Sequence, residues 1–246
     1  NSSQTIIDCF LKQTDKFSIE IKKNNPVQSI SQTQDGWTVQ STKALFECKK
    51  LLLATGSNPK IWNKLNALGH AIIPAVPSLF TFNINDTRLK KIPGVVAQNV
   101  YIKVLGTNLS SEGPLLVTHS GLSAPAILKL SAYGAIELAQ LNYNFEIQIN
   151  FIQQDAASCL LLLLSQKLES PKKLVRKTPL FSIPKRLWEQ LIEASEIGQN
   201  MRWADVKKVE LQNLTNQLTA SVFEVNGKST FKEEFVTAGG IDLKEI

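Results

Sequence analysis

Two apolar stretches of this sequence end in glycine, and each ending could lie against a bound ligand. Residues 51–54 (Leu-Leu-Leu-Ala) precede Thr55 and Gly56, and residues 236–238 (Val-Thr-Ala) precede Gly239 and Gly240. A glycine after a buried parallel strand lets the backbone approach a ligand at the carboxyl edge of the sheet, where open α/β sheets bind cofactors. Glycine also simply ends many strands, so each turn alone leaves both interpretations open.

His119 is the candidate catalytic residue, because imidazole exchanges protons near neutral pH. A structural role is equally open, in which His119 caps a helix expected to start near Ser123 or bonds a backbone carbonyl. Ser120 and Ser123 lack the GxSxG pattern of a hydrolase nucleophile, so we do not expect a serine hydrolase.

The cysteines and histidines do not group into a metal site. Cys9, Cys48 and Cys159 are widely spaced, and His70 lies far from His119. We expect no metal, no disulfide framework and the reduced thiols of a cytoplasmic protein. The longest uninterrupted apolar run, residues 159–164, is far shorter than the roughly 20 residues of a membrane-spanning helix, so we expect no membrane association.

Basic residues gather between Lys167 and Arg186. The chain carries a net charge of +6, and Glu169 is the one acid in this stretch. Such a run could contact nucleic acid or an acidic protein. Charge runs are more often solvated surface, and we favour that interpretation over nucleic-acid binding.

The first 56 residues predict a helix, strands and a small antiparallel meander. Apolar residues at helical spacing indicate a helix over residues 5–12, and alternation predicts a strand over residues 17–21. A continuous apolar run at residues 51–54 is typical of a parallel strand buried on both faces. Three short strands form the expected meander, at residues 27–30, 37–40 and 45–49.

Residues 71–149 predict a β-rich region that holds a single amphipathic helix. The helix is expected from Ser123 to about Leu141, because apolar residues repeat there at three and four positions. Pro and Gly separate the expected strands, which lie at residues 72–76, 95–105, 115–118 and 145–149.

A helical lobe is expected after residue 152. Asp155 can cap a helix that runs to about Leu168, and Ser182 with Pro184 can open a second helix that stops at Gly198. Residues 203–214 offer a third helix. Strands return at residues 222–225, before a turn at Asn226-Gly227, and at residues 235–238.

Four motifs in this order resemble one family of flavoproteins. They are GHAIIP at residues 69–74, PSL at 77–79, LVTHSGLSAPAIL at 116–128 and VTAGGI at 236–241, downstream of the ATG turn at 54–56. Together they resemble the YhiN/BaiN-like family of conserved bacterial flavoproteins, which are aminoacetone oxidase-like or NAD(P)/FAD-dependent oxidoreductases. The resemblance covers nearly the whole chain.

The resemblance implies an FAD-binding domain interrupted by an insertion. The expected fold class is α+β, with a β-rich inserted domain and a small helical lobe between incomplete edges of a Rossmann-like FAD domain. The implied boundaries are residues 1–68 for the partial FAD domain, 69–227 for the insertion and 228–246 for the return strand. Within the insertion, the β-rich part covers residues 70–152 and the lobe about 155–215.

The same resemblance implies which residues lie along the flavin. GxGxxG, the turn that binds pyrophosphate, occurs nowhere in the sequence, and Met201 is the only Met. We therefore expect an internal fragment of an FAD-dependent oxidoreductase that is inactive alone and does not bind FAD tightly. The implied flavin-edge residues are Ala54, Thr55, Gly56, Thr237, Ala238, Gly239 and Gly240.

The implied partners are a small-molecule substrate and NAD(P)H as a candidate electron donor, with the insertion capping or shaping the substrate side of the flavin. The alternative is a binding module that uses the basic lobe for nucleic acid or an acidic protein. Two departures from the family pattern stand out: Ser57 and Ala124 occupy positions where glycine is usual. Each adds a side chain near tight backbone, and the sequence leaves open whether packing or ligand approach changes.

Overall fold

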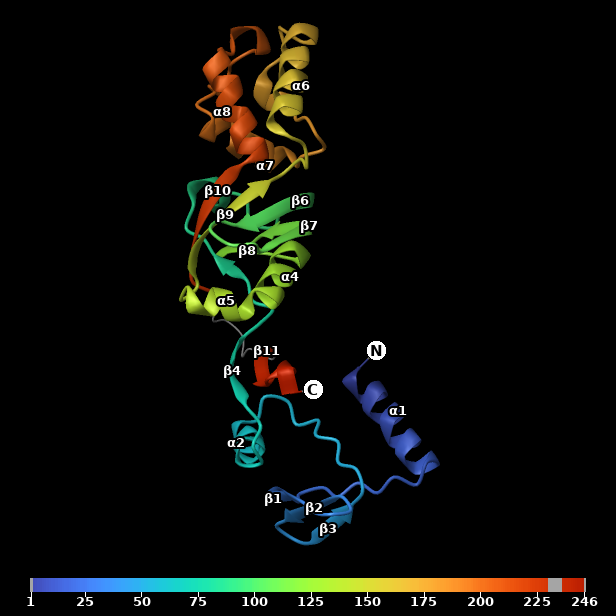
Figure 1. Ribbon diagram of the computed structural model, residues 1–246. Coiled ribbons are helices and arrows are strands. Elements are labelled where there is room, and N and C mark those ends of the chain that lie inside the picture. The colour runs from blue at the N-terminus through green and yellow to red at the C-terminus, as the bar shows by residue number, and fades with distance from the viewer. Residues whose placement is uncertain (1, 230–235, 246) are drawn as a thin grey trace. The chain divides into compact units, whose positions relative to one another are not determined.

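The computed structural model describes residues 2–229 and 236–245. The chain divides into two compact units (Figure 1), the first comprising residues Asn1–Ile73 and Ile241–Ile246 and the second Pro74–Gly240. Each unit is described by itself below.

The first unit contains the expected antiparallel meander. Gly36 makes the turn between its first two strands, where an added Cβ would lie 2.2 Å from the carbonyl oxygen of Cys48. Asn58 starts the second helix by accepting a hydrogen bond from the amide of Lys60 at 3.0 Å. The elements are α1 (Ser3–Lys16), β1 (Val27–Gln32), β2 (Trp37–Ser41), β3 (Leu45–Cys48), α2 (Pro59–Ala67) and η3 (Leu243–Glu245).

Two predicted strands of the first unit are wrong. Residues 17–21 and residues 51–54 have no strand structure. Ser18 has a left-handed φ angle of 52°, which interrupts an extended path through the first segment. Leu52 is 89% exposed, where a strand buried on both faces was expected. A parallel strand is stabilised by its neighbours in the sheet, and no strand of the described residues pairs with either segment.

The second unit is built on a six-stranded antiparallel sheet that curls into a nearly closed barrel. The strand order is β10-β9-β6-β7-β8-β5. The two outer strands meet through a bridge between Phe82 and Lys228 and a 3.0 Å bond from the Asn83 amide to the Gly227 carbonyl. The elements are β5 (Phe82–Asn83), α3 (Thr87–Lys90), β6 (Val96–Val104), β7 (Ser110–Val117), β8 (Gly121–Ser123), β9 (Asn144–Asn150) and β10 (Ser221–Asn226).

A β-bulge interrupts the pairing of β6 with β7. Ala97 pairs with Leu115 and Val100 with Gly113, so that Gln98 and Asn99 face Pro114 alone. Proline has no N–H to donate to the ladder, which explains why the extra residue is placed there.

The single helix expected between Ser123 and Leu141 is instead two helices, α4 (Pro125–Tyr133) and α5 (Ala135–Gln140). The break falls at Gly134, where an added Cβ would lie 2.4 Å from a methyl group of Leu109. This close approach comes from a distant hairpin, so helical spacing alone could not reveal it.

Three helices form the lobe, and Figure 1 shows them at one end of the barrel strands. Asp155 caps α6 (Ala156–Glu169) by accepting from the amide of Ser158 at 2.9 Å, as predicted. The second helix, α7 (Lys185–Ala194), ends before Gly198, because Ser195 forms its C-cap.

The third lobe helix differs from its prediction. Residues 203–214 do not form one helix: a 3-10 turn, η2 (Trp203–Asp205), precedes α8 (Lys208–Thr219). Glu210 accepts from the amide of Lys207 at 2.6 Å and so fixes the later start. A short 3-10 turn, η1 (Val175–Lys177), lies between α6 and α7.

One continuous hydrophobic core joins the barrel to the lobe. Trp188 and Trp203 are fully buried in the lobe, and Ile102 and Phe223 in the barrel. The predicted α+β class, with a β-rich domain and a helical lobe, is therefore confirmed.

The chain passes between the units along two paired strands. β4 (Ile72–Pro77) and β11 (Thr237–Ile241) form a two-stranded sheet, and the unit boundary falls within both strands. Phe235, part of the expected return strand, lies outside the described residues. No helix in the described part of the chain is long and apolar enough to cross a membrane.

Candidate functional site

The ATG turn lies in the first unit as exposed, irregular backbone. Ala54, Thr55 and Gly56 are all exposed. Gly56 has a left-handed φ of 59°, and an added Cβ would meet nothing within 4 Å. Ser57 is not among the residues with left-handed backbone, so its side chain adds no backbone strain. The turn thus presents bare backbone to open space.

The second glycine turn belongs to β11 in the second unit. Gly239 and Gly240 have φ angles of 125° and 121°, which L-residues rarely adopt. An added Cβ at Gly240 would meet nothing within 4 Å. Thr237 and Ala238 are half-buried in the same strand.

Both turns fit the edge of a flavin in one respect. Gly56 and Gly240 lack side chains where the surrounding space is open, so a planar ligand could approach the backbone of either one closely. The ATG turn leads into the N-terminus of α2 at Asn58, but the sequence has no GxGxxG turn to form the N–H cradle of a pyrophosphate. Each turn, taken by itself, therefore leaves open space beside its glycine, and its place along a flavin stays a prediction.

His70 lies next to the start of β4 and contacts the segment after β11. Its Nδ1 lies 2.9 Å from Oε2 of Glu245, and Oε1 of Glu245 accepts from the Ala71 amide at 2.8 Å. The hydrogen bond from the Ala71 amide, together with that from His70, lowers the pKa of Glu245. The contact between His70 and Glu245 joins residues that lie 175 positions apart in the sequence.

His119 lies in a tight loop between β7 and β8. Thr118 closes the loop, since its amide donates to the Gly121 carbonyl at 2.8 Å and its Oγ1 accepts from the Gly121 amide at 3.1 Å. An added Cβ at Gly121 would lie 2.1 Å from the Phe82 carbonyl oxygen. His119 itself is exposed, and it makes no hydrogen bond or ion pair with the described residues. It therefore caps no helix here, and its catalytic role stays a prediction.

Ala124 occupies strained backbone at the start of α4. Its φ of 81° and ψ of 175° lie in a region populated essentially by glycine. The glycine that is usual at this position in the resembling family would adopt this conformation freely. Ala124, in place of the usual glycine, is thus a source of local backbone strain.

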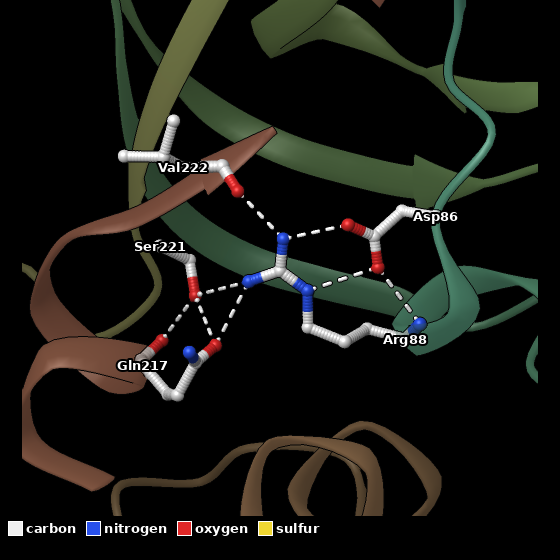
Figure 2. A network of polar contacts seen from close by, with 5 residues as sticks. All are labelled: Asp86, Arg88, Gln217, Ser221 and Val222. Atoms are coloured by element: carbon white, nitrogen blue, oxygen red, sulfur yellow. Dashed lines mark hydrogen bonds and ion pairs between the residues drawn. The ribbon is translucent and has the colours of Figure 1, made fainter. Parts of the chain in front are cut away.

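Arg88 joins α3 to the junction between α8 and β10 (Figure 2). Its Nε and one terminal nitrogen donate to the Asp86 carboxylate at 2.9 and 2.7 Å, and Gln217 Oε1 accepts at 2.9 Å. Ser221 Oγ lies 3.5 Å away and the Val222 carbonyl 2.6 Å. Every guanidinium nitrogen is engaged, so Arg88 holds the lobe to the barrel and is not available to an anion.

The pKa of Asp86 reflects this network. Burial acts to raise the pKa, but the hydrogen bonds and the charge of Arg88 outweigh it and hold the pKa below its usual value. The carboxylate therefore stays ionised and keeps the pair intact at neutral pH.

The basic run from Lys167 to Arg186 divides into two groups. Lys167 donates to the Val206 carbonyl, Arg176 pairs with Glu189 at 3.0 Å, and Arg186 donates to the Lys91 carbonyl at 2.8 Å. The remaining side chains are exposed and have no hydrogen bond or ion pair within the described ranges; they are Lys172, Lys173, Lys177 and Lys185.

The sequence comparison with protein families matches residues 76–236 to the HI0933-like protein barrel and H2TH domain. The match begins in β4 and extends through the barrel and lobe. It covers more than half of the chain.

Three curated relatives align along nearly the full chain. "Ribosomal RNA dihydrouridine synthase" of Haemophilus influenzae is 27% identical across 99% of this chain and 61% of its own length. The protein of the same name from Escherichia coli is 25% identical across 100% and 61%. "3-dehydro-bile acid delta(4,6)-reductase" of Clostridium scindens is 19% identical across 100% and 63%.

This chain thus spans about three fifths of the length of the relatives it matches. The family resemblance inferred from the four motifs is confirmed by the matched barrel and lobe. The chain belongs to the HI0933-like family of flavoproteins.

Proposed function

We propose that this chain is the substrate-recognition part of an FAD-dependent oxidoreductase that reduces a uracil base in RNA. The observation that carries the choice of RNA is the group of exposed lysines on the helical lobe that form no ion pair, Lys172, Lys173, Lys177 and Lys185. Lysines without an ion-pair partner can neutralise phosphates and release counterions. From the sequence alone, nucleic-acid binding by the basic run was less favoured than a solvated surface. The proposal adopts nucleic-acid binding.

The relatives support the proposal. Both proteins named for ribosomal RNA dihydrouridine synthesis align along essentially the whole chain, at higher identity than the bile acid reductase. Dihydrouridine formation adds two hydrogen atoms across the 5,6 double bond of uracil. NAD(P)H is the proposed source of the hydride, and solvent supplies the proton.

FAD would carry the hydride to the base when bound. The glycine turn at Gly240 would lie along its edge, and the barrel with its lobe would bind and orient the RNA. His119 is exposed and unpaired in its loop, so it is the residue proposed to move a proton at the substrate.

The test uses the complete flavin-loaded protein, an RNA transcript and NADPH. Mass spectrometry of digested RNA should show a nucleoside that has gained two hydrogen atoms, and the product should be missing when NADPH is omitted. Purification of a colourless protein, or unchanged RNA with every transcript tried, would contradict the proposal.

The lysines can be tested separately by salt dependence. Replacing Lys172 and Lys173 by Gln should weaken RNA binding and reduce the slope of log affinity against log salt by about 1 for each phosphate that is no longer neutralised. Gln at Lys12 and Lys43, two exposed lysines of the first unit, serves as the matched control.

A small unsaturated ketone is the second candidate substrate, because the bile acid reductase also aligns with the entire chain. This candidate predicts NADPH oxidation on addition of a conjugated steroid ketone without RNA. It also predicts that the lysine variants turn over normally.

A further inference from the structure

A cleft of about 220 Å³ opens where the barrel meets the helical lobe. The β6 bulge and the loop before α7 form its walls, and they include Gln98, Asn99, Phe181 and Ser182. We propose that this cleft binds one unpaired base of an RNA. The inference rests on the proposed function and adds the place where the RNA is recognised.

The bulge places two residues with amide side chains at the cleft. Gln98 and Asn99 face Pro114 in place of a regular ladder, and bulges re-aim side chains in this way. Both residues are exposed, and neither side chain makes a hydrogen bond to the described residues. An amide offers a donor and an acceptor together, and hydrogen bonds of this kind read the edge of an unpaired base.

The opposite wall supplies an aromatic ring on constrained backbone. Phe181 and Ser182 both have φ angles of 57°, a conformation that is uncommon for a bulky residue such as Phe. Phe181 also packs against the hydrophobic core, so its position is fixed. Aromatic side chains stack on unpaired bases, and stacking tolerates different bases.

The size and charge of the cleft favour a base over other ligands. Its volume falls below the roughly 300–1,000 Å³ of pockets for drug-sized ligands. No charged residue lines it, so phosphate is not the group held inside. None of the flavin-edge residues lines it either, and the bound base is therefore one that positions the RNA, distinct from the base that is reduced.

Positive charge lies directly beside the cleft. Pro184 is a lining residue, and Lys185 and Arg186 follow it at the start of α7. Arg186 donates to the Lys91 carbonyl at 2.8 Å, which fixes this end of the helix against the loop after α3. Lys185 is exposed and could contact a neighbouring phosphate, while the amides contact the base.

The experiment measures binding of a short single-stranded RNA containing 2-aminopurine to the complete flavin-loaded protein. The double variant Gln98→Ala/Asn99→Ala should bind at least about fivefold more weakly, because it loses the hydrogen bonds to the base edge. Both residues are exposed, so the fold should be retained. The control is Asn200→Ala/Gln212→Ala, which removes two exposed amides of the lobe outside the cleft.

A second variant tests stacking. Phe181→Leu keeps an apolar side chain but removes the ring, so it should reduce the quenching of 2-aminopurine in the bound RNA. Binding of heparin, a polyanion without bases, should be unchanged in both cleft variants.

The outcomes separate the two proposals. If wild-type protein binds the RNA and Gln98→Ala/Asn99→Ala binds it equally well, the cleft inference is overturned while the proposed function stands. If wild-type protein neither binds RNA nor reduces uracil in it, both are overturned. Equal affinity for the RNA and for the same strand paired in a duplex would also overturn the cleft inference.

Discussion

The two units of this chain differ in how far they bury their apolar side chains. The second unit gathers them into one core that runs from Phe80 in the barrel through the lobe to Val225. The first unit leaves many of them exposed: α1 buries no residue, Phe10 is 69% exposed and Leu52 is 89% exposed. Among the described residues, the first unit buries few apolar side chains, such as Ile61 and Leu65, and the second unit buries most of the core.

This difference agrees with the family assignment. The family match covers the barrel and lobe, and the relatives are longer than this chain. A helix of 14 residues is marginal in water unless its apolar face is packed. In the described part of the first unit, α1 and Leu52 lack such packing.

The largest difference in the free energy of unfolding should come from the same Leu→Ala substitution made in each of the two units. Leu214→Ala removes a fully buried side chain from the lobe and should lower the free energy of unfolding by about 2–5 kcal/mol. Leu52→Ala should change it by less than about 0.5 kcal/mol in the isolated chain. Urea unfolding followed by circular dichroism measures both, and equal losses would remove the distinction between the units.

The Arg88 network should give the next largest effect. Arg88→Ala leaves Asp86 partly buried without its partner and should cost about 1–3 kcal/mol. This is less than for a fully buried pair, because the two side chains are 15% and 23% exposed. Lys129→Ala on α4 is the control, since Lys129 is exposed and is not among the groups that act on Asp86. If the two variants unfold at the same urea concentration, the network does not hold the lobe to the barrel.

A smaller effect of opposite sign is expected at the strained start of α4. Ala124→Gly should stabilise the second unit by about 1 kcal/mol, since relief of the backbone strain exceeds the entropic cost of glycine. Ala157→Gly, at an exposed position of α6, should instead destabilise it, by up to about 1 kcal/mol. Thermal unfolding distinguishes the signs, and destabilisation by both changes would refute the strain at Ala124.

The smallest effect is local and depends on pH. The pKa of Glu245 is lowered in the folded state. The stability that its ionised carboxylate contributes is therefore complete above its unfolded pKa near 4.5, and it is lost as the pH falls through the folded pKa. Glu245→Gln should remove this acid-side dependence. This pH dependence is measured as the protection factor of the Ala71 amide against hydrogen exchange. The control, Glu47→Gln at an exposed residue of the same unit, should leave the protection factor unchanged.

The fold followed from the sequence where local patterns decide it. Asp155 was recognised as a helix cap because its bond to the Ser158 amide lies within one turn. The strands β6, β9 and β10 followed from alternation and turn residues, whereas β5, β8 and the first half of β7 were not predicted. Residues 51–54 were misassigned because a continuous apolar run indicates a buried strand only if neighbouring strands are present.

The site depends on contacts between distant residues, which spacing does not reveal. Gly134 ends α4 because of Leu109, and His70 meets Glu245 across 175 positions. The cleft was missed as well. Its available signals were Pro114 within an alternating strand and Phe181 within the basic run, and each is weak alone.

The pairing of β4 with β11 has an evolutionary consequence. The chain enters and leaves the barrel through neighbouring strands, and the Ser78 amide donates to the Val236 carbonyl at 3.0 Å beside this crossing. A module whose two ends are adjacent can be gained, lost or exchanged between host proteins without displacing the host's own strands. The barrel and lobe could thus have been inserted as one domain, and moving them to another flavoprotein would need only two chain junctions.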